Sequence, residues 1–112
     1  MRKRIYLAIP YTGMEEISFR VANSFAGGLI EQGYSVYSPI SHSHPIAQQT
    51  ELPNEYAFYR EMDESMIELW AESVFVVCLK GWEKSVGVQA ELEFAKKLGK
   101  EIMFIHIDPE VL

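Results

Sequence analysis

The sequence predicts an α/β fold, a three-layer sandwich in which helices cover both faces of a parallel sheet of four or five strands. Short, continuously apolar segments recur along the chain, which is typical of strands that are covered on both faces. Longer segments with the period of an amphipathic helix separate them. Because each strand is followed by such a connection, we expect right-handed crossovers and the strand order 2-1-3-4. This arrangement is flavodoxin-like or Rossmann-like.

The predicted elements begin with a strand that Pro10 ends, followed by a helix that Gly33 ends. Gly28 shares the apolar face of this helix, which predicts a close approach to the sheet. The segment 38–52 is polar, contains two prolines and two histidines, and is predicted to be an irregular loop with a functional or mobile character. We expect strands over residues 5–9, 34–37, 74–79 and 101–106, and helices over residues 14–32, 55–71 and 85–98.

The composition limits the classes of partner. With 112 residues we expect one domain over residues 1–112. A net charge of −6 argues against a nucleic-acid polymer, which needs a basic surface, but leaves open a small anion held by backbone amides. No apolar run approaches the roughly 20 residues of a membrane span, and the N-terminus lacks a signal-peptide core. Cys78 lies within a predicted strand, so we expect a reducing, cytoplasmic location without membrane contact.

Two carboxylates lie on apolar faces of predicted helices. Glu91 shares a face with Val88 and Leu92, and Asp63 lies within the apolar face of the helix over residues 55–71. A buried carboxylate without a partner is costly and has a raised pKa, so such a residue is usually functional. The structural alternative for Glu91 is a hydrogen bond to a tyrosine or a backbone amide. For Asp63 it is a hydrogen bond that fixes a loop.

The segments that follow the strands should meet at one crevice, because ligands of parallel sheets bind at the carboxyl ends of the strands. Tyr11 and Trp82 have aromatic rings suited to stacking on a base or to packing over the sheet edge. Ser85 and Gly87 open a helix, where they would bind an anion or serve only as a helix start. The side chains expected there are Tyr11, Ser38, His42, His44, Trp82, Ser85 and Glu91, with Asp63 joining them if its helix packs across the crevice.

Several of these segments resemble a known group of enzymes. Residues 85–92 (Ser-Val-Gly-Val-Gln-Ala-Glu-Leu) resemble the catalytic segment of nucleoside 2-deoxyribosyltransferases and of the related deoxynucleoside 5′-monophosphate N-glycosidases. Together with residues 6–11 and 38–46, this segment is similar to a small bacterial and phage family of the same fold. The resemblance implies that Glu91 acts at C1′ of a sugar and that Asp63 orients the substrate or handles the proton of the leaving base. It also implies that Ser85 and Gly87 bind a 5′-hydroxyl or a 5′-phosphate.

The leading hypothesis is therefore cleavage or transfer at the N-glycosidic bond of a nucleoside or nucleoside 5′-monophosphate, without a metal or another cofactor. The alternative is a catalytically silent module that binds a nucleotide in the same crevice. His42 and His44 leave open a role in handling the base and, less favourably, a metal hydrolase. The large apolar residues of the helix over residues 55–71 predict a homodimer or a higher homo-oligomer.

Overall fold

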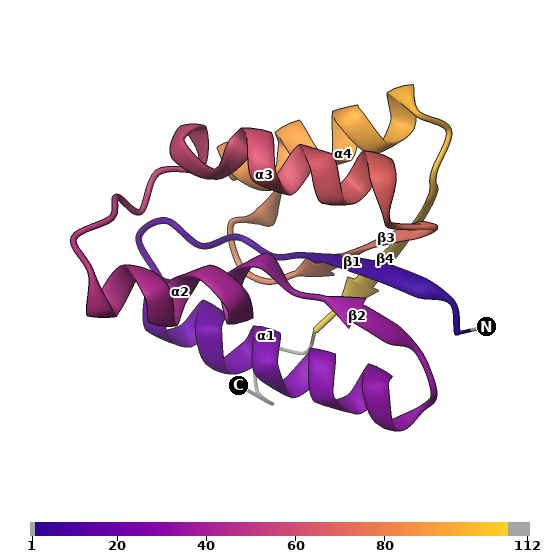
Figure 1. Cartoon of the computed structure of the whole chain (residues 1–112), viewed down its shortest axis with the longest axis horizontal. Coiled ribbons are helices and arrows are strands. Elements are labelled where there is room, and N and C mark those ends of the chain that lie inside the picture. Colours follow the sequence, from indigo (N-terminus) through magenta and orange to yellow (C-terminus); the bar gives the residue numbers. More distant parts are fainter. Residues whose placement is uncertain (1, 108–112) are drawn as a thin grey trace.

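The computed structural model describes residues 2–107, so the ends of the predicted domain, residue 1 and residues 108–112, lie outside the described residues. Four parallel strands form one sheet in the order β2-β1-β3-β4, as predicted, and residues 2–107 form no fifth strand (Figure 1). The strands are β1 (Arg4–Ala8), β2 (Ser35–Tyr37), β3 (Ser73–Cys78) and β4 (Glu101–His106).

The helices lie in two layers, one on each face of the sheet (Figure 1). One layer contains α1 (Glu15–Glu31) and α2 (Pro39–Gln49), and the other contains α3 (Tyr56–Leu69) and α4 (Val86–Lys97), with the short 3-10 helix η1 (Trp82–Lys84) before α4. The three-layer sandwich is therefore confirmed. No helix within residues 2–107 combines the length and the apolar character that crossing a membrane requires.

Alternate residues of β1 and β3 face opposite layers, which creates two separate cores. Ile5 and Leu7 pack beneath α1 and α2, whereas Tyr6 and Ala8 pack beneath α3 and α4. Tyr6 is completely buried in the second core, although it carries a hydroxyl group. A buried hydroxyl needs a partner, and this requirement leads directly to the site described below.

The segment predicted to be irregular contains α2, so that prediction is wrong. Ser38 caps the helix by accepting a hydrogen bond from the Ser41 backbone N–H at 3.3 Å, and Pro39 occupies the first helical position. Pro45 lies inside the helix, where its ring removes one backbone donor. The start signals and the packing of α2 against α1 outweigh the low helix propensity of this polar segment.

The prediction for Gly28 is also wrong. Gly28 is exposed, and a Cβ atom added to it would meet no atom within 4 Å. The buried face of α1 consists of Ser18, Val21, Ala22 and Leu29, whereas Ile17 is 45% exposed. The helical pattern of the sequence places Ile17 on the same apolar face as Gly28, so the observed buried face is rotated relative to the expected one, because the small residues Ser18 and Ala22 face the sheet.

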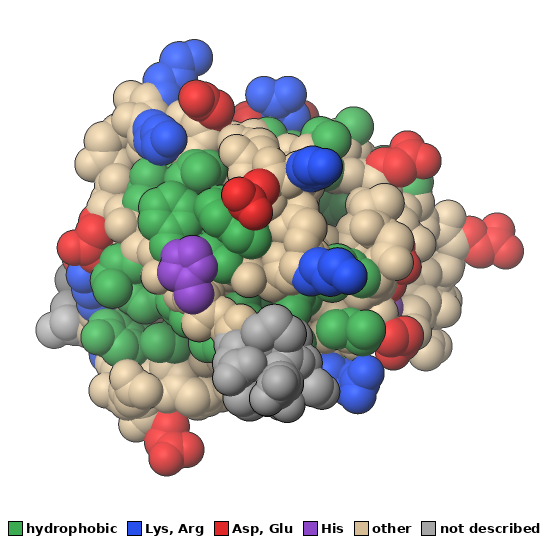
Figure 2. Space-filling view, turned by 180° about the vertical axis from the view of Figure 1, so that it is seen from behind, with side chains coloured by type: hydrophobic (Ala, Val, Ile, Leu, Met, Phe, Trp, Pro, Cys, Tyr) green, Lys and Arg blue, Asp and Glu red, His purple; other side chains and the backbone are tan. Residues whose placement is uncertain are grey.

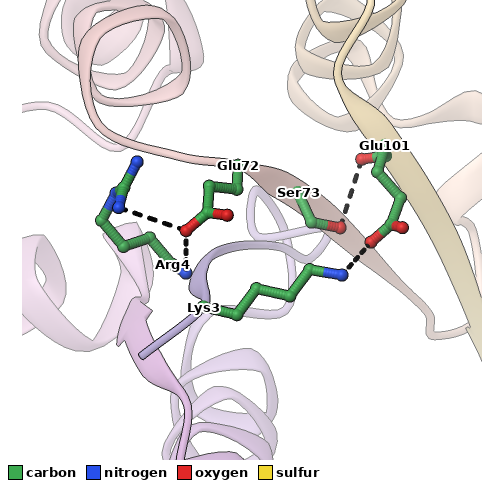
Figure 3. A network of polar contacts seen from close by, with 5 residues as sticks. All are labelled: Lys3, Arg4, Glu72, Ser73 and Glu101. Carbon is green, nitrogen blue, oxygen red and sulfur yellow. Dashed lines mark hydrogen bonds and ion pairs between the residues drawn. The ribbon is translucent and has the colours of Figure 1, made fainter. Parts of the chain in front are cut away.

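Polar contacts hold the amino ends of the strands together (Figure 3). Lys3 Nζ contacts Glu101 Oε1 at 2.5 Å, and Arg4 Nη1 contacts Glu72 Oε1 at 3.2 Å. The Ser73 hydroxyl donates to the Glu101 backbone oxygen at 3.3 Å. These contacts join β1, β3 and β4 at the edge of the sheet opposite to the carboxyl ends. They leave the carboxyl ends open for a ligand.

Candidate functional site

A cavity of about 550 Å³ opens at the carboxyl ends of the strands. A volume of this size is typical of small-molecule sites. Its polar wall comes from the turn after β1, from α2, from α3 and the segment before it, and from α4 and the turn before it. The residues of this wall that have polar side chains, together with the glycine in the first turn of α4, are Tyr11, Thr12, Ser43, His44, Asn54, Glu55, Tyr56, Tyr59, Asp63, Lys80, Lys84, Ser85, Gly87 and Glu91.

Glu91 reaches this cavity from the second turn of α4 but is only 5% exposed. Its helical face also carries Val88 and Leu92, which are buried, so the carboxylate is carried inward with the apolar residues. The Tyr6 hydroxyl donates a hydrogen bond to Glu91 Oε2. Burial raises the pKa of Glu91 well above its ordinary value, the Tyr6 hydrogen bond opposes this rise, and the charge of Asp63 adds to it.

Asp63 lies on α3 and is buried to the same degree, with an exposure of 5%. Burial raises its pKa from 3.8 to about 7. Its Oδ1 atom has no hydrogen-bond partner among the described residues. An unpaired buried carboxylate is costly, and such groups are concentrated at functional sites. Two carboxyl groups that are easily protonated therefore share one cavity.

Tyrosines surround the two acids. Tyr56 lines the cavity at the start of α3, and its buried hydroxyl has no partner among the described residues. Burial raises the pKa of Tyr56 and also raises that of Tyr37 to about 12, with the charges of Asp63 and Glu91 acting in the same direction. These phenols therefore keep their protons near neutral pH. The unpartnered Tyr56 hydroxyl is a hydrogen-bond donor available to a ligand.

The start of α4 forms the second polar region of the cavity. Ser85 caps the helix, and its Oγ accepts from the Val88 N–H at 3.2 Å. A Cβ on Gly87 would lie 3.0 Å from Tyr56 Cδ1, so glycine permits the tyrosine ring to pack directly on the first turn of the helix. Lys80 and Lys84 have exposed side chains beside this turn. Backbone N–H groups and two cations together favour an anionic group here.

A third set of polar groups joins the cavity to α1 and α2. The Tyr11 Oη atom lies 2.6 Å from His44 Nδ1, and His44 Nε2 lies 3.2 Å from Glu16 Oε1. The His44 side chain is buried, and its ring packs against Phe19 with a centroid distance of 4.5 Å. His44 is thus held in one orientation, in contact with a tyrosine that lines the cavity.

The structure brings together six of the predicted site residues and separates three others from them. Ser38 caps α2, His42 is exposed beside the Tyr37 ring, and Trp82 packs on Phe104 at the edge strand β4. None of these three lines the cavity. The residues that line it are Tyr11, His44, Asp63, Ser85, Gly87 and Glu91.

A hydrogen bond from a tyrosine to Glu91 was the structural alternative that the sequence left open, and Tyr6 makes this bond. The Tyr56 ring and the cations Lys80 and Lys84 were not predicted to line the cavity. Lys80 lies just after β3, directly before Gly81, and Lys84 ends η1, and these positions after a central strand could have indicated them. For Tyr6 a signal was also present, because it is a polar side chain inside a central strand. Within residues 2–107, no three histidine, cysteine or acidic side chains are grouped as a metal ion would require.

Comparisons with known proteins agree with the fold described above. Residues 3–107 match the DUF1937 family, described as a domain of unknown function. None of the curated proteins matches the sequence at a significant level. Among solved structures, the fold is similar to that of a 2-desoxiribosyltransferase from Leishmania mexicana, with a TM-score of 0.67 and 18% sequence identity. The similarity covers 95% of this chain but 65% of that protein, and it confirms the expected deoxyribosyltransferase-like fold.

Proposed function

The chain belongs to the DUF1937 family and has a deoxyribosyltransferase-like fold, and on this basis we propose that it cleaves or transfers at the N-glycosidic bond of a nucleoside or nucleoside 5′-monophosphate. The observation that carries the proposal is Glu91, a carboxylate held in an apolar helix face at the wall of a cavity of suitable size. Breaking an N-glycosidic bond develops positive charge at C1′, and a carboxylate facing that carbon stabilises the charge or bonds to it.

The ionisation of Glu91 has to be favoured by the substrate. Burial favours the neutral acid, and among residues 2–107 the Tyr6 hydroxyl is the group that stabilises the anion. A developing cation at C1′ would stabilise the carboxylate strongly, because the surrounding apolar groups weaken electrostatic interactions little. The interaction would therefore be stronger in the transition state than with the bound substrate, as catalysis requires.

Asp63 suits the second acid–base role. A carboxyl group with a pKa of about 7 is partly ionised near neutral pH, where its anion can act as the base that takes a proton from the attacking water. Its unpartnered oxygen and the unpartnered Tyr56 hydroxyl are both buried. Polar groups of a bound substrate would satisfy each of them.

The start of α4 suits the 5′ end of the substrate. Ser85, the Gly87 backbone and the cations Lys80 and Lys84 would hold a 5′-phosphate, or a 5′-hydroxyl with fewer contacts. Glu91 follows Ser85 by six positions, which is about 9 Å along a helix axis at ~1.5 Å per residue. The anion site and the carboxylate therefore lie on neighbouring turns of one helix.

The second candidate is a catalytically silent module that binds a nucleotide in the same cavity. The raised pKa of Glu91 favours this alternative, because a neutral carboxylic acid is a hydrogen-bond donor and a poor nucleophile. Such a module would retain the anion site and use Glu91 to hold a sugar hydroxyl group.

The experiment is to incubate the protein with the four common 2′-deoxynucleosides and their 5′-monophosphates and to measure free base by liquid chromatography. We expect release from at least one compound, and a loss on the order of 10³-fold or more in Glu91→Gln. Glu93→Gln, an exposed position on the same helix, is the matched control and should retain activity. Unchanged release in Glu91→Gln would exclude this residue as the catalytic carboxylate. Thermal stabilisation by a monophosphate without release of base would instead support the silent module.

A further inference from the structure

Three side chains form a continuous hydrogen-bonded chain from the molecular surface to the cavity. Glu16 lies in the first turn of α1 with its side chain 69% exposed, and His44 lies on α2 with its side chain 4% exposed. Tyr11, in the turn after β1, lies on the cavity wall. The distances are 3.2 Å from Glu16 Oε1 to His44 Nε2 and 2.6 Å from His44 Nδ1 to Tyr11 Oη. The buried imidazole therefore connects an exposed carboxylate with a phenol inside the site.

The partners determine which atom donates in each contact. Glu16 Oε1 also accepts from Gln48 Nε2 at 2.9 Å, so the carboxylate is the acceptor and His44 Nε2 carries a hydrogen. In the neutral imidazole, Nδ1 then accepts from the Tyr11 hydroxyl. When His44 gains a second proton, Nδ1 becomes a donor to Tyr11 Oη, and the Tyr11 hydrogen becomes available to a group in the cavity. The protonation of His44 thus determines which way Tyr11 donates.

From this arrangement we infer that Tyr11 is the general acid for the leaving base and that His44 and Glu16 supply its proton. The inference rests on the proposed function. As the bond from C1′ to the base nitrogen breaks, Glu91 bonds to C1′ and the electron pair moves to the base. The base takes the proton of Tyr11 Oη, Tyr11 Oη takes the proton of His44 Nδ1, and His44 Nε2–H remains with Glu16. Water then attacks C1′ and breaks its bond to Glu91, ionised Asp63 takes the proton that the water loses and passes it to solvent, and His44 recovers a proton from solvent beside its exposed partner.

A structural role alone is the competing explanation, because the same contacts join the turn after β1 to α1 and α2. The two explanations differ in how the effect depends on the leaving group. A natural base leaves poorly without a proton, whereas 4-nitrophenolate leaves as a stable anion. Loss of a general acid should slow only the first reaction, whereas a distorted cavity should slow both.

The experiment uses Tyr11→Phe, which keeps the ring and removes only the hydroxyl group. Its probes are the deoxynucleoside monophosphate that the wild type cleaves fastest and 4-nitrophenyl 2-deoxy-β-D-ribofuranoside 5-phosphate. We expect a loss on the order of 10²-fold or more on the monophosphate and less than about 10-fold on the nitrophenyl compound. Equal losses on both probes, or no loss on the monophosphate, would overturn the inference. If the wild type releases no base from any deoxynucleoside or monophosphate, the proposed function fails and the inference fails with it.

A second variant and a spectroscopic measurement provide independent tests. Glu16→Gln should also lose more activity on the monophosphate than on the nitrophenyl compound, with a smaller loss than Tyr11→Phe. Glu15→Gln removes the same charge from the neighbouring position and should not show this difference between the probes. Glu15 Oε2 accepts from the Gly13 N–H at 2.8 Å and belongs to the start of α1. In the ¹⁵N spectrum of neutral His44 we expect the Nε2–H tautomer. An Nδ1–H tautomer, or identical effects of the two glutamate variants, would contradict the proton path.

Discussion

Asp63→Asn should stabilise the folded protein as the pH rises above 4. The substitution replaces a buried carboxyl group by an amide of nearly the same shape, which cannot ionise. In the wild type, burial raises the pKa of Asp63 from 3.8 to about 7, and Oδ1 has no partner among the described residues. Between these two pH values the folded state binds more protons than the unfolded chain, so the stability of the wild type falls as the pH rises. The asparagine variant lacks this fall.

The size of the effect follows from the shift in pKa. Each pH unit between the two pKa values costs about 1.4 kcal/mol, so the complete penalty above pH 7 is about 4 kcal/mol. Part of this penalty is already present at pH 5. The stability of Asp63→Asn relative to the wild type should therefore increase by on the order of 2–3 kcal/mol between pH 5 and pH 8. Since a domain of this kind has a total stability of about 5–15 kcal/mol, the difference is readily measured.

The assay is urea unfolding of both proteins at pH 5 and pH 8. Glu61→Gln, an exposed position on the same helix, is the control and should show no comparable change with pH. A constant difference between Asp63→Asn and the wild type at the two pH values would refute the reasoning, because it would mean that Asp63 ionises in the folded protein as readily as in water. The assay needs no substrate, so it tests the electrostatics of the site independently of its function.

Two further predictions concern Glu91 and the apolar surface. Tyr6→Phe removes the donor to Glu91 and should raise the pKa of that carboxyl group further, as ¹³C NMR of labelled glutamate can measure; an unchanged titration would contradict the stabilising role of Tyr6. Phe58 and Leu69 on α3 are 54% and 82% exposed, and further hydrophobic side chains gather on the face that carries β4 (Figure 2). Because exposed apolar surface often marks an interface, we expect light scattering at micromolar concentration to show a homodimer or higher oligomer. A monomeric mass would contradict this prediction.

The sheet could be predicted almost completely from the sequence. Its central strands are continuously apolar because both faces are covered, and this pattern sets them apart from the helices. The segment that forms α2 could not be assigned in the same way. Its prolines, serines and histidines have low helix propensity, and the packing of α2 against α1 is a long-range contact that no local pattern contains. Only Ser38 and Pro39, as a cap and a first helical residue, carried a local signal.

The cavity could be predicted in part. Glu91 and Asp63 were indicated by helical periodicity, because a carboxylate on an apolar face has to be buried. The side-chain positions of residues in turns could not be predicted in this way, because the direction of a side chain after a strand depends on the conformation of the turn. Trp82 shows this clearly: it follows β3, as a site residue should, but its ring packs outward on Phe104. Helical periodicity alone places Tyr56 among the large apolar residues of segment 55–71, whereas its hydroxyl group is buried at the cavity.

The distribution of charge over the cavity provides a criterion that separates the two candidate functions. Lys80 and Lys84 lie beside the first turn of α4, and the acids Glu91 and Asp63 lie deeper in the cavity. A nucleotide that only binds places its negative charge near the lysines and a neutral sugar near the acids, so both acids would stay easily protonated. A transition state with positive charge at C1′ instead favours ionised Glu91. A stable cationic mimic of that transition state should therefore bind more tightly than the corresponding monophosphate only if the cavity is built for catalysis.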